Sequence, residues 1–214
     1  AEVMKITPRF GVTRIIEQRS PSRDRIKAPC PVFTQCGGCK LQDIKYEKQM
    51  EFKVGVVKDA LKHIGKIESS SIRSVPAEKT YNYRNKGSFA IQKQAGFIRM
   101  GFFKQGSHDV ISTERCGILH DPINDAKEFI RELLIKHQVS IYDEKKHLGL
   151  FRELVIRHSQ TTNQLLVGLV TTVGDFSEEF LEELTNKNTC RKLSICGIVQ
   201  NINSQKTNVI LGKE

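Results

Sequence analysis

The segment CPVFTQCGGCKLQ, residues 30–42, restricts the possible structures of this chain more than any other stretch. It places Cys30, Cys36 and Cys39 around a Gly-Gly pair, in a loop with few apolar residues of its own. Three thiols in so short a loop either form disulfides or bind metal. The chain of 214 residues has six cysteines and no N-terminal secretory signal, so the sequence favours a metal in a reducing, cytoplasmic environment.

A fourth ligand is needed, and the best candidate is Cys116 in STERCGILHDP. It is followed by Gly117, and a tight glycine turn lets backbone amides approach a bound sulfur. Structural zinc sites usually take their ligands as two close pairs, whereas only Cys36 and Cys39 form such a pair here. Three thiols in one loop and a fourth far along the chain suit an iron–sulfur cube, in which each iron atom is bound by one cysteine. Iron–sulfur, zinc and idle or disulfide-bonded thiols all stay open on this reasoning.

Two further cysteines have simpler interpretations. Cys196 lies in the apolar run LSICGIVQ, which predicts a small core residue on a strand, and Cys190 in NTCRK predicts a loop thiol. Neither has a base or an acid nearby in the sequence, which argues against a catalytic role.

The first half of the chain predicts one helix and a β-meander. Apolar residues recur every four positions from Phe52 to Ile64, which predicts a helix over residues 43–64 with Gly65 as its C-terminal cap. Residues 81–114 contain short aromatic and β-branched runs separated by glycine or polar breaks, the pattern of consecutive antiparallel strands.

The second half alternates helices and strands. Residues 120–138 predict a helix with Asp121 as N-cap, Pro122 in its first turn, and a buried face made by Phe129, Leu133 and Leu134. Further strands are expected at residues 150–159, 164–172, 193–203 and 207–212, with a short helix at 176–187. Short connections predict an α+β fold with a mostly antiparallel sheet, two or three helices and a cysteine-rich cluster-binding loop. No apolar run approaches the length of a membrane span.

Several stretches of the sequence resemble one protein family. CPVFTQCGGCKLQDIKYEKQMEFK resembles the iron–sulfur signature of the RNA uracil-5-methyltransferases, which include enzymes acting on 23S ribosomal RNA and on transfer RNA. YNYRNKGSFAI, FRELVIRHS and VQNINSQKTNVILGKE also look like blocks of that family, in its order. The resemblance implies that Cys30, Cys36, Cys39 and Cys116 hold a 4Fe-4S cluster, which acts as a structural staple because methylation at uracil C5 needs no redox step.

The resemblance also implies what this chain lacks. In the family a C-terminal domain binds S-adenosylmethionine and supplies a catalytic cysteine and a general base; it would begin after about residue 214. We find no catalytic residue here and expect the chain alone to be inactive. The start without Met and the end at Lys213-Glu214 suggest an excised piece of a longer protein. Residues 1–29 resemble the end of a TRAM-like RNA-binding β-barrel, with its last strand at 6–18, plus a linker. Residues 30–214 would form the central iron–sulfur and RNA-binding domain.

A formal charge of +10 favours a polyanionic partner, and the resemblance implies RNA, with ribosomal RNA preferred over transfer RNA. No Asp or Glu interrupts the basic residues between Lys79 and Lys104, and aromatic residues lie among them. Rings can stack on bases, but they equally suit the core face of a sheet, which we expect for the Phe residues. The residues expected to contact RNA are Arg23, Arg25, Lys27, Arg84, Lys86 and Lys104.

We expect a monomeric protein that binds no membrane. The alternative from another class is a stand-alone zinc-bound nucleic-acid-binding module with no enzymatic activity.

Overall fold

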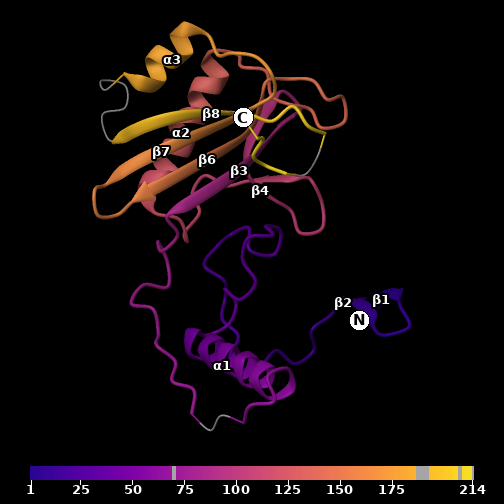
Figure 1. Ribbon diagram of the computed structural model, residues 1–214. Coiled ribbons are helices and arrows are strands. Elements are labelled where there is room, and N and C mark those ends of the chain that lie inside the picture. Colours follow the sequence, from indigo (N-terminus) through magenta and orange to yellow (C-terminus); the bar gives the residue numbers. More distant parts are fainter. Residues whose placement is uncertain (69–70, 187–192, 207–208, 214) are drawn as a thin grey trace. The chain divides into compact units, whose positions relative to one another are not determined.

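The protein is described by a computed structural model, in which residues 1–68, 71–186, 193–206 and 209–213 are placed (Figure 1). Its chain divides into two compact units. The first comprises Ala1–Pro29 and Leu41–Ser74, and the second comprises Cys30–Lys40 and Val75–Glu214. Residues 41–74 thus group with the first unit, and the cysteine loop groups with the second.

The first unit contains a hairpin and one helix. Strands β1 (Glu2–Ile6) and β2 (Gly11–Arg14) pair antiparallel, and only β2 falls within the strand expected at 6–18. Backbone bonds from Ile26 to Asp43 and from Lys45 to Asp24, each of 2.9 Å, tie the linker to the residues before helix α1 (Tyr46–His63). The helix predicted over 43–64 is thus confirmed in type and begins three residues later.

Gly65 does not take the left-handed conformation expected of a C-terminal cap. Lys66 takes it instead, with φ of 55°, while the backbone N–H of Gly65 still donates to Ala60 O at 3.1 Å. No residue of α1 is buried, and Phe52 and Val56 are 61% and 52% exposed.

The second unit is built on a six-stranded sheet in the order β5-β4-β3-β6-β7-β8. Its strands are β3 (Lys86–Gln94), β4 (Phe97–Phe103), β5 (Val110–Ser112), β6 (Phe151–Ser159), β7 (Gln164–Thr171) and β8 (Ile195–Ile202). All neighbours pair antiparallel except β7 and β8, because helix α3 (Glu178–Thr185) lies in the connection between them and returns the chain to the same end of the sheet. The predicted α+β class with a mostly antiparallel sheet is confirmed.

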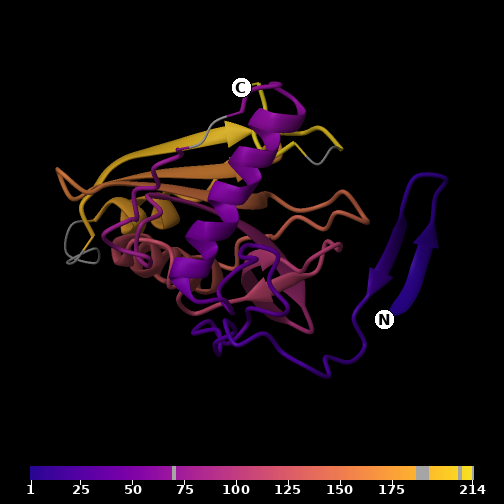
Figure 2. The same cartoon turned by 90° about the horizontal axis from the view of Figure 1, so that it is seen from below.

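Helices α2 (Asp121–Lys136) and α3 cover one face of this sheet, and Figure 2 shows both on the same side of the strands. The core between them joins alternate residues of the strands, such as Leu154 and Ile156, to Leu134 of α2 and Phe180 of α3, all fully buried. Each such side chain stabilises the fold by about 1.5–3 kcal/mol on burial. Within the described part of the chain, no helix is long and apolar enough to span a membrane.

The expected details of α2 are partly confirmed. Pro122 lies in the first turn, and Leu133 and Leu134 are buried, while Phe129 is half-buried at the edge of the core. The N-cap is His120, so the expectation of Asp121 was wrong by one residue. Asp121 instead begins the helix and binds Arg115 at 2.6 Å.

Two predictions near the C-terminal end are also corrected. Residues 209–212 form no strand, because the side-chain amide of Asn203 donates to the carbonyls of Val209 and Ile210 that a sheet neighbour would need. Residues 207 and 208 lie outside the described part.

Cys196 is exposed rather than in the core. The β7–β8 register shifts between Leu165 and Leu166, so the extra residue Cys196 leaves the alternation and its thiol donates to Leu165 O at 3.2 Å. Cys190 lies outside the described residues.

Candidate functional site

The loop of Cys30–Lys40 has no regular structure but is fixed to the sheet. Cys36 forms an isolated antiparallel bridge with Lys104, just past the end of β4, and Gly37 donates its N–H to Phe103 O at 2.9 Å. A Cβ atom at Gly37 would lie 3.0 Å from that same oxygen, so glycine allows this close approach. The loop is therefore anchored to one strand end by backbone contacts.

Cys116 belongs to the same unit and follows strand β5 in the chain. Asn124 on α2, which is 2% exposed, accepts from the N–H of Cys116 at 2.8 Å and donates to its carbonyl at 3.2 Å. The next residue, Gly117, accepts from the N–H of Asn82 at 2.9 Å. The sequence did not predict either partner of this segment, Asn124 or Asn82. A single asparagine carries no sequence pattern that identifies the residue to which it will bond.

Cys36 and Cys116 each lie close enough to Cys30 and Cys39 to be affected by them. Burial raises the pKa of Cys116, the backbone N–H groups that follow it lower it, and the thiols of Cys39 and Cys30 raise it further. Burial also raises the pKa of Cys36, the N–H of Gly38 at 3.4 Å lowers it, and Cys39 and Cys30 raise it. Backbone donors aimed at sulfur stabilise thiolates. The two cysteine segments, distant in sequence, thus meet in one neighbourhood of the second unit.

The same thiols affect Tyr81. Burial raises the pKa of this phenol, and Cys39 and Cys30 add to the effect. Among the described residues, no group of three or more His, Cys, Asp or Glu side chains is close enough to hold a single metal ion.

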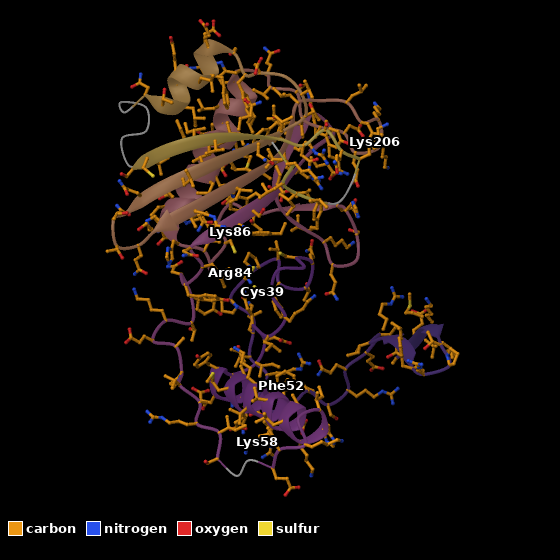
Figure 3. The ribbon with its side chains drawn as sticks, in the orientation of Figure 1. Cys39, Phe52, Lys58, Arg84, Lys86 and Lys206 are labelled. Carbon is orange, nitrogen blue, oxygen red and sulfur yellow. The ribbon has the colours of Figure 1, made fainter. Side chains whose placement is uncertain are left out.

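The cations expected to contact RNA fall into two sets. Arg84 and Lys86 lie on the second unit, exposed, and Figure 3 shows both on the same side of it as Cys39. Lys104 is exposed opposite Cys36 in the bridge described above. None of these three forms an ion pair within the described ranges. Burial raises the pKa of Glu153 on β6, and the nearby charge of Lys86 lowers it.

The other set, Arg23, Arg25 and Lys27, lies in the linker of the first unit. Arg23 and Lys27 are exposed, whereas Arg25 pairs with the carboxylate of Asp43 and is partly committed to holding the linker. The expected core position of the Phe residues holds for Phe89, which is fully buried, while Phe97 is 76% exposed.

One group of polar side chains was not predicted from sequence. His120 and His158 are 9% and 7% exposed, and their Nδ1 atoms lie 2.8 Å apart. They line an open pocket with residues of the β6–β7 turn and of the segment before β3. No spacing in the sequence connects two single histidines 38 positions apart.

Comparisons with known proteins agree with the family resemblance. The chain is 38% identical over 212 residues to a protein of Clostridium tetani described as an uncharacterized RNA methyltransferase, covering 99% of this chain and 46% of the relative. A protein of Clostridium acetobutylicum with the same description is 35% identical over 216 residues, again covering 46% of the relative. The chain therefore spans about half the length of these curated relatives. No protein-family profile matches the sequence.

A solved structure is also similar. It is the Pyrococcus abyssi tRNA (uracil-54, C5)-methyltransferase in complex with S-adenosyl-L-homocysteine, with a TM-score of 0.62 and 25% identity over 86% of this chain and 40% of that one. Nearly the whole of this chain is thus homologous to one part, about half the length, of proteins that are described as RNA methyltransferases.

Proposed function

We propose that this chain is the RNA-binding part of an S-adenosylmethionine-dependent RNA uracil-5-methyltransferase, and that its four gathered cysteines hold a 4Fe-4S cluster. The observation that carries the proposal is the meeting of Cys30, Cys36, Cys39 and Cys116 in one unit, beside exposed cations, in a chain homologous to RNA methyltransferases.

The residues fit the cluster on chemical grounds. An iron–sulfur cube takes one thiolate per iron, and four thiols are present. The N–H of Gly38 and the N–H groups after Cys116 point at sulfur, as is common around such clusters. When bound, the cluster would crosslink the loop to the sheet.

In this proposal RNA lies along exposed cations. Arg84, Lys86 and Lys104 of the second unit and the linker residues Arg23, Arg25 and Lys27 would hold phosphates. We propose ribosomal RNA as the substrate from the sequence resemblance, whereas the archaeal neighbour acts on transfer RNA. Binding of a 23S ribosomal RNA fragment and of a transfer RNA in the same assay distinguishes the two.

The methyl-transfer groups belong, in this proposal, to the half of the relatives that the chain does not span. There a cysteine thiolate would attack C6 of a flipped-out uracil so that C5 can accept the methyl group from S-adenosylmethionine. The chain by itself would bind RNA without methylating it, as a monomer in the cytoplasm.

The proposal is tested by replacing one cysteine inside the set and one outside it. Cys36→Ser should abolish the brown colour and bound iron of anaerobically purified protein and lower its melting temperature. The matched control Cys196→Ser should keep both, because this thiol lies on β8 outside the set. Full iron content and unchanged melting in Cys36→Ser would refute the ligand assignment, and a colourless wild type carrying one zinc ion would favour the zinc-bound module.

A further inference from the structure

A second site lies where the segment before β3 meets the β6–β7 turn. The pocket there has a volume of about 560 Å³, within the range of roughly 300–1,000 Å³ typical of small-ligand sites. Its lining includes Tyr83, Asn85, Arg157, Gln160 and Gln164, and none of its lining residues is an Asp or a Glu. Amides, a phenol ring and a guanidinium are the groups that bind bases and phosphates.

The pocket has a fixed backbone frame. Tyr83 donates its N–H to Ile118 O at 3.1 Å, and Asn85 O accepts from His158 at 2.8 Å. His120 donates its N–H to Arg84 O at 3.0 Å. The segment of residues 82–85, which also bonds Gly117 beside Cys116, is therefore held between residues 117–120, just before α2, and strand β6.

Charge at the pocket points to an anion. Lys86 and Arg157 are direct partners in the β3–β6 register, so two cations face each other across adjacent strands. Like charges in this position destabilise a sheet. Both residues are exposed, and neither forms an ion pair among the described residues. Arg157 lines the pocket, whereas Lys86 is its partner on the neighbouring strand and lies close enough to Glu153 to lower the pKa of that carboxyl, which burial raises. A phosphate between them would remove the repulsion.

The histidine pair forms one wall of the pocket. Nδ1 of His120 lies 2.8 Å from Nδ1 of His158, and Nε2 of His158 lies 3.0 Å from the side-chain oxygen of Asn163. Both rings line the pocket and are buried, so these contacts hold that wall in place.

We propose that this pocket binds one unpaired nucleotide of the RNA, with Arg157 and the neighbouring Lys86 on phosphate and Tyr83 stacked on the base. Tyr83 is 53% exposed, so its ring has a free face for stacking. This site rests on the proposed function, since it would bind part of the same RNA. It adds a contact separate from the cysteine neighbourhood.

The test measures binding of a fluorescently labelled single-stranded RNA 12-mer of mixed sequence to the full chain by anisotropy at several salt concentrations. Tyr83→Ala should weaken binding about tenfold, and Tyr83→Phe, which keeps the ring, should stay within about twofold of wild type. Arg157→Gln should weaken binding and reduce the salt slope by about one. The charge-matched control Lys146→Gln, beyond the opposite end of β6, should leave the slope unchanged.

Two failures are distinguishable. If wild type binds the RNA while Tyr83→Ala binds equally well, or Arg157→Gln behaves like Lys146→Gln, the pocket proposal is wrong and the proposed function stands. If wild type binds no RNA, both are wrong.

Discussion

The two long helices of the chain differ in what covers them. Helix α1 in the first unit has 18 residues and none is buried, whereas α2 in the second unit has 16 residues and seven are buried. Both carry apolar residues at helical spacing. Periodicity therefore predicts the helical conformation of each, but burial also requires an opposing surface, which the sheet supplies to α2. In the described part of its own unit, α1 has no comparable surface.

The two units also use charge differently. In the second unit Lys127 is 1% exposed, and its ammonium donates to the carbonyls of Thr113 and Glu114, which lie just before Cys116. In the first unit Arg25 pairs with Asp43 at a half-exposed position, and the lysines of α1 are mostly in water. The second unit thus contains a buried, hydrogen-bonded cation next to the segment of Cys116, and among the described residues the first unit has no comparable buried charge.

The largest expected difference is in packing. Phe180→Ala on α3 removes a fully buried ring and should lower the free energy of unfolding by about 3–5 kcal/mol. Phe52→Ala on α1 removes a ring that is 61% exposed and should change it by less than about 1 kcal/mol. Urea unfolding of both variants measures the contrast; equal losses would mean that α1 is packed as tightly as the core of the second unit.

A smaller difference is expected in pH dependence. Burial, followed by the charges of His158 and Lys79, lowers the pKa of His120. The unfolded state then binds more protons, so this contribution to stability is fully present above the unfolded pKa of about 6.5 and is lost as the pH falls below it.

Unfolding measured between pH 7.5 and pH 5 should therefore be flatter for His120→Gln than for wild type. His63→Gln, which replaces an exposed histidine of α1, should follow the wild-type slope. An identical slope in all three proteins would show that His120 does not titrate abnormally in the folded state.

The smallest expected effect concerns the linker. Arg25→Gln breaks the pair with Asp43, whose members are 39% and 23% exposed, and should cost about 0.2–1 kcal/mol in the first unit. Arg23→Gln removes the same charge without breaking an ion pair of the described residues and should cost less. If Arg25→Gln proved as damaging as Phe180→Ala, the first unit would depend on this one pair.

The sequence predicted most elements because their signals are local. The alternation in FRELVIRHS and the helical spacing of Leu133 and Leu134 predicted the correct element types. The strand expected at 207–212 was not found over residues 209–212, because the side chain of Asn203 binds the carbonyls that strand pairing needs. The prediction that Cys196 lies in the core was wrong. Its exposure results from the register shift between β7 and β8, which depends on the neighbouring strand and not on the sequence around Cys196.

The candidate site was predictable only in part for the same reason. The cysteines could be named from spacing and resemblance, since their pattern is a property of the chain itself. Asn124, which positions Cys116, and the His120–His158 pair could not be named, because each depends on which segments the fold brings together. Long-range polar partners leave little trace in a single sequence.

The central claim is that four cysteines bind one 4Fe-4S cluster in the second unit. The most direct measurement is the content of iron, acid-labile sulfide and zinc in the wild-type chain, purified without oxygen. We expect iron and sulfide in equal amounts approaching four per chain, with negligible zinc. Protein that contains zinc in place of iron, or that cannot retain iron and sulfide after anaerobic reconstitution, would contradict the account.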